Sequence, residues 1–244
     1  MSQNTLIVSN WKMNFNFIQA KNLVTNLKNI KYNKAKLINV ICPQFLLLPT
    51  LNKVLPKSDF ILGAQDFHYD LNGPYTGDTS IELVKDFNCK YSIIGHSERR
   101  TFHNESNSTI KKKVRLCLEN LIIPILCVGE SIEQRKKNIY KEYILKQLKE
   151  CLQKITCEEL VVAYEPIWSI GTGIIPTVED IVEISELIFA FLENKKINKF
   201  KILYGGSVNS SNFNEINSIG KINGALIGGS SLKIDEMEKI LTSC

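Results

Sequence analysis

Three side chains, far apart in the chain, are of the types that together could carry out a proton transfer: Lys12, His96 and Glu165. Removal of a proton beside a carbonyl group needs a base, a hydrogen-bond donor to the oxygen and a positive charge near the developing enolate. Each residue alone has a structural explanation, as a solvated lysine, a hydrogen-bonded histidine or a carboxylate that caps a helix. The combination of base, donor and cation predicts proton-transfer chemistry.

Two pairs of glycines indicate a phosphate site. Gly205-Gly206 precede Ser207, and Gly228-Gly229 follow another apolar run about twenty residues later. Backbone N–H groups at the start of a short helix commonly hold phosphate, and a serine hydroxyl could donate as well. Either pair alone could simply make a tight turn, but two pairs in equivalent positions favour phosphate binding.

A repeated pattern would place these residues. Eight short apolar or β-branched runs occur at intervals of roughly 31 residues, the length of one strand, one crossover helix and their loops. The predicted strands are Leu6–Val8, Leu37–Cys42, Phe60–Gly63, Tyr91–Ile94, Ile122–Val128, Leu160–Ala163, Phe200–Tyr204 and Ala225–Ile227. Helix-length segments separate them, and Thr177 could cap the helix before the seventh strand.

This pattern predicts an α/β fold, a single (β/α)8 barrel in which residues 1–244 form one domain. No Ser/Gly/Pro-rich linker divides the chain, although an open, doubly wound sheet would show the same periodicity. The candidate residues directly follow predicted strands. A barrel would therefore bring them together at its carboxyl-terminal face, where barrel enzymes carry their chemistry.

The composition excludes several classes of protein. With 44% hydrophobic and 23% charged residues, the chain is neither disordered nor fibrous. The longest apolar run, Leu121–Val128, is too short to span a membrane, and the N-terminus lacks the features of a signal peptide. Seven cysteines without metal-type or redox-type spacing indicate cytoplasmic thiols and no metal site. A net charge of +5 is low for a nucleic-acid binder and would attract a small anionic substrate.

Two long connections have expected roles. The segment Pro166–Pro176 begins directly after Glu165, includes Trp168 and contains glycines, as expected of a lid that excludes water from the reaction. The loop of residues 65–80 carries several aromatic side chains, which favours a protein interface.

At these residues the sequence resembles the triosephosphate isomerase family, over essentially its full length. The motifs that carry the resemblance are Asn10-Trp11-Lys12-Met13-Asn14, Gly95-His96-Ser97-Glu98-Arg99-Arg100, Cys127-Val128-Gly129-Glu130, Ala163-Tyr164-Glu165-Pro166-Ile167-Trp168, Tyr204-Gly205-Gly206-Ser207-Val208 and Gly228-Gly229. The resemblance implies a homodimeric TIM barrel that interconverts dihydroxyacetone phosphate and glyceraldehyde 3-phosphate without a metal or an organic cofactor.

The resemblance also implies roles for individual residues. A glutamate base and a neutral histidine electrophile are the known arrangement in that family, so Glu165 would move the proton and His96 would polarise the carbonyl. Asn10 and Lys12 would stabilise the substrate oxygens, and Glu98 would support Lys12 and His96. The phosphate would be held by Gly171, Ser207, Gly228 and Gly229. The loop around Thr76 would reach the partner subunit near its active site.

Several positions depart from the family pattern. Ile174 stands where the lid usually has lysine, and Ile175-Pro176 replace small residues at its closing end. Asp78 stands in place of glutamate, which shortens by one methylene a side chain expected to pair with Arg99 of the partner subunit. Asn138 replaces a usual glycine. None of these positions is the proposed base or electrophile.

Two other functions fit the barrel less well. An aldolase would need a Schiff-base lysine, and an epimerase commonly needs a metal or paired acids; neither set of residues is evident. A catalytically silent scaffold is the alternative from another class of protein. The intact Lys12, His96 and Glu165 argue against it. Glu130 and Arg135 are expected to form a structural ion pair.

Overall fold

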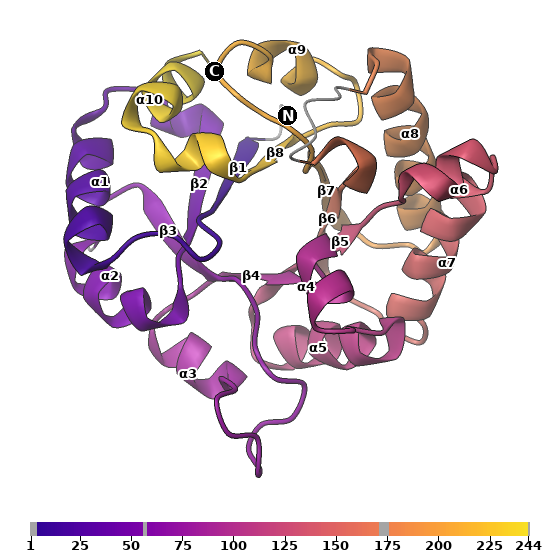
Figure 1. Ribbon diagram of the computed structural model, residues 1–244, viewed down its shortest axis with the longest axis horizontal. Helices are drawn as coiled ribbons and strands as arrows, with labels where there is room; N and C mark the ends of the chain where they lie inside the picture. Colours follow the sequence, from indigo (N-terminus) through magenta and orange to yellow (C-terminus); the bar gives the residue numbers. More distant parts are fainter. Residues whose placement is uncertain (1–3, 56–57, 171–175, 244) are drawn as a thin grey trace.

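The computed structural model describes residues 4–55, 58–170 and 176–243, and its strands form a closed barrel (Figure 1). Neighbouring strands are parallel and follow chain order, with β1 hydrogen-bonded to both β2 and β8. The strands are β1 Thr5–Asn10, β2 Leu37–Cys42, β3 Phe60–Ala64, β4 Tyr91–Ile94, β5 Ile123–Val128, β6 Glu159–Tyr164, β7 Lys199–Tyr204 and β8 Gly224–Ile227. The predicted (β/α)8 TIM barrel is confirmed.

All eight predicted runs are strands. The bounds of β2 and β4 agree with the prediction, and the other six differ by one or two residues at an end. Most of these differences add polar residues such as Asn10 and Glu159, which pair with the neighbouring strand through their backbones. Apolar patterning does not detect such residues, because the ladder needs only their N–H and C=O groups.

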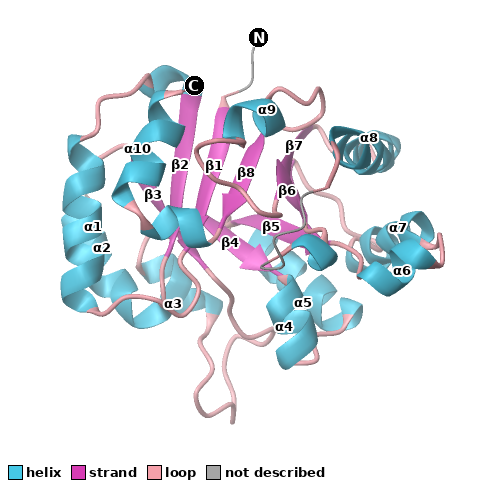
Figure 2. Ribbon diagram, turned by 45° about the horizontal axis from the view of Figure 1, so that its top comes forward, coloured by secondary structure: helices cyan, strands magenta, loops and turns pink. Residues whose placement is uncertain are grey.

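Helices surround the barrel as an outer ring (Figure 2). The described helices are α1 Phe17–Asn29, α2 Leu48–Val54, α3 Ile81–Asp86, α4 Ser97–Phe102, α5 Asn107–Glu119, α6 Ile132–Lys136, α7 Tyr140–Cys151, α8 Val178–Asn194, α9 Phe213–Asn217 and α10 Ile234–Thr242. Thr177 caps α8 as predicted, and the Asp180 side chain accepts the Thr177 N–H in return. This reciprocal capping fixes the start of α8 directly after Pro176.

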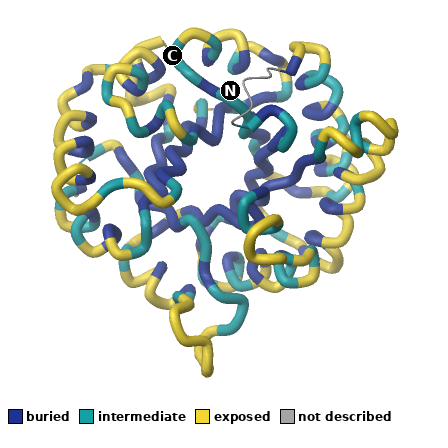
Figure 3. Tube along the Cα trace, in the orientation of Figure 1, coloured by how far each residue is buried: buried dark blue, intermediate teal, exposed yellow. Residues whose placement is uncertain are grey.

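The apolar core has two layers. Side chains on one face of the strands fill the barrel interior, among them Leu6, Val40 and Leu203. Residues on the other face, such as Ile7 and Ile202, pack against the buried stripes of the helices. Figure 3 shows the buried strands inside a more exposed ring. Because both faces of every strand are covered, the strands are rigid supports for the loops at their carboxyl ends.

Two loops bear on the predictions. Asn138, which stands where the family usually has glycine, has a φ of 55°, a left-handed conformation that asparagine tolerates better than most residues. The loop of residues 65–80 projects from the barrel between β3 and α3 (Figures 1 and 2). Among the described residues, no helix has the length and apolar character needed to cross a membrane.

Candidate active site

Glu165 lies directly after β6 and is almost completely buried. Its Oε2 accepts the backbone N–H of Ser97 at 2.9 Å, and its Oε1 is 2.9 Å from Nε2 of His96. Ser97 is the first residue of α4, so the carboxylate lies at the positive end of a helix. The structure thus brings the predicted base and electrophile into direct contact.

His96 follows β4 and caps the first turn of α4 with its imidazole ring. Nδ1 accepts the backbone N–H of Glu98 at 3.2 Å. A nitrogen that accepts a hydrogen bond must keep its lone pair, so the ring proton of the neutral imidazole is on Nε2. That nitrogen lies 2.9 Å from Oε1 of Glu165, and the His96 side chain lines the cavity described below.

Opposing effects act on the pKa of His96. Burial lowers it, but the neighbouring Glu165 and Glu98 carboxylates outweigh burial and hold the pKa above its usual value of 6.5. Lys12 opposes this rise. A movement of the Glu165 carboxylate away from the ring would weaken its contribution to the rise.

Lys12 follows β1 in a left-handed conformation, with a φ of 50°. The strain of this conformation is offset by two hydrogen bonds: Asn10 Oδ1 accepts the Lys12 N–H, and Gln65 Nε2 donates to the Lys12 carbonyl oxygen. The ammonium group lies 2.6 Å from Oε1 of Glu98. Glu98 thus contacts Lys12 and lies 3.6 Å from His96 Nδ1, as the sequence prediction placed it.

A cavity of about 330 Å³ lies beside these groups at the carboxyl ends of the strands. Its lining includes Asn10, Lys12, His96, Ser207, Gly228 and Gly229, so six predicted site residues share one cavity. Gly229 begins a short 3-10 turn, which presents N–H groups at its start. Gly171, like Ile174 and Ile175, lies outside the described residues.

Gly205 makes room for Glu165. A Cβ atom at Gly205 would lie only 3.0 Å from Cγ of Glu165 and 3.1 Å from the carbonyl oxygen of Tyr164. The carboxylate faces Ser97 and His96. A side chain at position 205 would therefore crowd the side chain of Glu165.

Glu130 joins the elements at the base of the proposed lid. Its Oε1 accepts hydrogen bonds from Arg135, Tyr164 and Trp168 at 2.7, 3.1 and 2.8 Å. Arg135 also binds Asp180 in the first turn of α8 at 2.6 Å. The expected ion pair between Glu130 and Arg135 is therefore present, within a larger network at both ends of the Pro166–Pro176 segment.

Two parts of the site were missed by sequence reasoning. Gln65 bridges the carbonyl oxygens of Lys12 and Cys42 and so ties β1, β2 and the end of β3 together. Its place directly after a predicted strand was the available signal. The N–H of Ser97 was also missed, because a backbone donor has no sequence signal. Within the described ranges, no group of three or more His, Cys, Asp and Glu residues could hold a metal ion.

A buried carboxylate against an imidazole, with an ammonium group and a glycine-lined cavity at the carboxyl ends of a barrel, defines a class of protein. It is the class of barrel enzymes that move protons on small anionic substrates. The comparison with protein families is more specific. The model of the family described as triosephosphate isomerase matches residues 5–244, and the chain belongs to that family.

Similar proteins agree with this assignment. A triosephosphate isomerase of Dictyoglomus turgidum is 40% identical over 245 residues, which cover 98% of both chains. One of Orientia tsutsugamushi (strain Boryong) is 40% identical and covers 97% of this chain and 96% of its own. One of Mycoplasmopsis pulmonis is 38% identical, with the same two shares. The chain is thus an isomerase that interconverts dihydroxyacetone phosphate and glyceraldehyde 3-phosphate.

Proposed function

We propose that Glu165 and His96 carry the proton transfers of this isomerisation. Glu165 takes the proton from the carbon beside the carbonyl group, which leaves an enediolate, and returns it to the neighbouring carbon. His96 donates its Nε2 proton to the carbonyl oxygen and moves protons between the two oxygens. The observation that carries the proposal is the 2.9 Å contact between the carboxylate of Glu165 and Nε2 of His96.

Lys12 and the glycines supply the electrostatic part of the proposal. The ammonium group of Lys12 and the side chain of Asn10 stabilise the negative oxygen of the enediolate. Ser207, Gly228 and Gly229 hold the phosphate with a hydroxyl group and backbone N–H groups, and Gly171 contributes from the lid. The shared cavity supports this arrangement, because it lies between Lys12 and the glycines. Glu98 holds Lys12 and His96 in place.

The test is a coupled assay of triose phosphate interconversion on the purified protein, with a metal chelator present. Replacement of the base by an amide, Glu165→Gln, is expected to lower kcat by roughly 10²–10⁴-fold, because the amide cannot take the proton. Glu119→Gln, an exposed change on α5, is the control and should leave kcat unchanged. Activity that survives Glu165→Gln would refute the proposed base.

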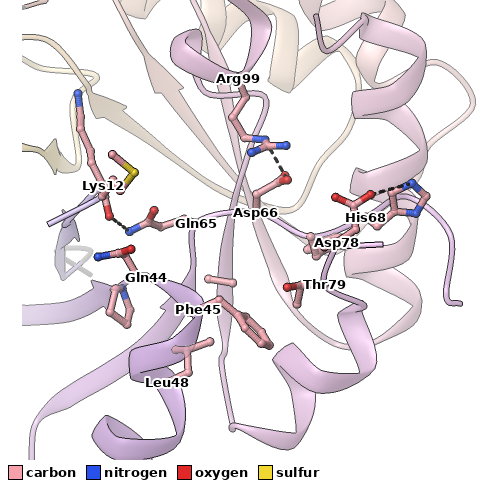
Figure 4. Close-up of a pocket in the computed structure, with 15 residues that line it drawn as sticks. Lys12, Gln44, Phe45, Leu48, Gln65, Asp66, His68, Asp78, Thr79 and Arg99 are labelled. Carbon is pink, nitrogen blue, oxygen red and sulfur yellow. Dashed lines mark hydrogen bonds and ion pairs between the residues drawn. The ribbon is translucent and has the colours of Figure 1, made fainter. Parts of the chain in front are cut away.

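We also propose that the chain acts as a homodimer, assembled through the loop of residues 65–80. The partner's loop would occupy a second cavity of about 280 Å³, whose lining includes Lys12, Gln65 and Arg99 (Figure 4). The loop is well suited to insertion because it is internally braced. The ring of His68 stacks on Tyr75 with centroids 3.8 Å apart, and the Tyr75 hydroxyl donates to Asp70 at 2.6 Å.

The same loop carries Asp78, whose expected partner is Arg99 of the partner subunit. Within the chain Asp78 lies 3.7 Å from Nε2 of His68, while Arg99 binds Asp66 at 2.9 Å (Figure 4). In the proposed dimer Arg99 would keep its contact with Asp66 and face the partner's loop.

We further propose that residues 1–244 act as one domain in the cytoplasm, as supported by the free thiols of the described cysteines.

A further inference from the structure

The segment that carries Glu165 runs beside the segment that ends β5. The N–H of Glu165 donates to the carbonyl oxygen of Val128 at 2.8 Å, and the N–H of Ile167 donates to that of Glu130 at 3.1 Å. These two bonds continue the pairing of β5 and β6 beyond the ends of both strands. The backbone position of Glu165 therefore depends on the path of residues 128–130.

Gly129 lies between these two bonds and in contact with the backbone of Glu165. A Cβ atom at Gly129 would lie 1.7 Å from the carbonyl oxygen of Glu165 and 2.7 Å from its carbonyl carbon. No side chain fits there without moving Glu165. Any shift or rotation of Gly129 is consequently transmitted to the backbone that carries the proposed base.

The N–H of Gly129 is held by a side chain from the helix outside the barrel. It donates to Oε1 of Gln147, on α7, at 2.9 Å. Gln147 is 3% exposed and lies among the apolar side chains that attach α7 to the barrel, between Ile144 and Cys151. A polar side chain on such a face is disfavoured unless it makes hydrogen bonds. Its bond to Gly129 accounts for a glutamine at this position.

We propose that Gln147 is a positioning residue for Glu165. By holding the N–H of Gly129, it fixes the backbone of residues 128–130 and so fixes the starting point from which the carboxylate rotates toward the substrate. A displacement of about 1 Å at a reacting group can cost roughly 10²-fold in rate. The inference rests on the proposed role of Glu165 as the base.

The test compares replacements that remove or keep the acceptor. Gln147→Met has a similar length and no carbonyl oxygen, so the N–H of Gly129 loses its partner. We expect kcat to fall about tenfold or more, while KM and the competitive inhibition constant of inorganic phosphate change by less than about threefold. Gln147 lines a cavity of about 310 Å³ together with two cations, Arg100 and Lys146, and two acids, Glu105 and Glu150. Gln147→Glu keeps an oxygen acceptor there and should restore most of the lost kcat.

A merely structural role predicts a different result. Leu148→Ala, at the next buried position of α7, should lower stability while the hydrogen bond from Gly129 to Gln147 is kept, and it should leave kcat per folded molecule unchanged. A second variant without the acceptor, Gln147→Leu, is measured as well, so that the result does not depend on one replacement that folds. Normal kcat in the folded Met or Leu variant, or an equal loss in Leu148→Ala, would overturn the positioning role.

The two proposals fail in distinguishable ways. If Glu165→Gln retains activity, Glu165 is not the base, and the positioning of its carboxylate has no bearing on the rate. If Glu165→Gln abolishes activity but the Met and Leu variants of Gln147 keep a normal kcat, the base is supported and only the role of Gln147 is refuted.

Discussion

Two half-buried carboxylates beside the candidate active site, Asp66 and Glu105, share the same two cations. Asp66 follows β3 and lies in a cluster of four charges: its Oδ1 is 2.6 Å from Lys113, whose side chain is 3% exposed, and its Oδ2 is 2.9 Å from Arg99. Glu105 binds the same two cations. Two acids therefore share two cations between the barrel and α5. The stability of this cluster must depend on the protonation of its acids.

The pKa of Asp66 gives the sign of that dependence. Burial raises it from 3.8 to about 6, against the pull of Lys113, and the carboxylate of Glu105 adds to the rise. Between these two pH values the folded state binds more protons at Asp66 than the unfolded state. The contribution of Asp66 therefore favours folding at low pH and is lost as the pH rises through about 6.

The prediction concerns the difference in unfolding free energy between the unmodified chain and Asp66→Asn, which cannot titrate at this position. This difference should fall by roughly 2 kcal/mol between pH 4.5 and pH 7.5, at about 1.4 kcal/mol for each unit of pKa shift. Urea unfolding at a fixed protein concentration measures it. Asn214→Ser, an exposed change that involves no titratable group, should give a flat difference. A difference that rises with pH would contradict the assignment.

The residues of the site could be predicted from the sequence only in part. That Lys12, His96 and Glu165 lie close together could be predicted, because each follows a strand and parallel strands bring such positions to one end of a barrel. The bonds that orient them could not be found. The hydrogen bond from the Ser97 N–H to Glu165 depends on where α4 begins. Gln65 reaches Lys12 only because of the path that the backbone takes after β3.

The elements could be predicted more completely than the bonds. Strand bounds were correct to within two residues, because each strand has a run of apolar residues buried on both faces. The helices α4 and α6 were not separately predicted. They have six and five residues, which is too short for a periodic apolar pattern, and they lie at the carboxyl ends of β4 and β5, where the site is built.

The closing end of the proposed lid is one of the places where the sequence departs from the family pattern. Pro176 is buried and directly precedes Thr177, the cap of α8, whereas Ile175 lies outside the described residues. Proline fixes its own φ and restricts the residue before it to extended conformations. The start of α8 is fixed by its capping bonds and by the ion pair of Asp180 with Arg135. The backbone restriction that Pro176 imposes therefore acts on the part of the lid that precedes it.

We therefore expect the Ile175-Pro176 to Val-Ala variant to open and close its lid faster, because two restricted backbone positions are freed. The chemistry should stay intact, since neither residue carries a catalytic group. Temperature-jump relaxation of Trp168 fluorescence, with inorganic phosphate present, measures the lid rate, and the coupled assay measures kcat. Thr242→Ser, on the distant α10, is the control. Equal relaxation rates in the variant and the unmodified chain would refute this role.

At the scale of the whole molecule, the proposed dimer would cover an apolar region that one chain leaves exposed. Met13, directly after Lys12, is 88% exposed and lines the cavity proposed for the partner's loop, together with the half-buried Phe45. The same cavity is lined by Lys12 itself. Association would thus both bury apolar surface and press a loop against the strand end that carries Lys12.

A charge at Met13 tests this arrangement. In a monomer Met13→Glu places a carboxylate in water at little cost, but under the partner's loop that carboxylate would be buried, so the dissociation constant of the dimer should rise at least about a hundredfold. Leu121→Glu is the matched control, because Leu121 is 86% exposed and lies at the opposite, amino-terminal end of the barrel, before β5.

Sedimentation velocity over a range of concentrations measures the association of both variants. We expect the unmodified chain and Leu121→Glu to sediment as dimers at micromolar concentration, and Met13→Glu to dissociate. If all three sediment alike, the loop of residues 65–80 does not form the interface.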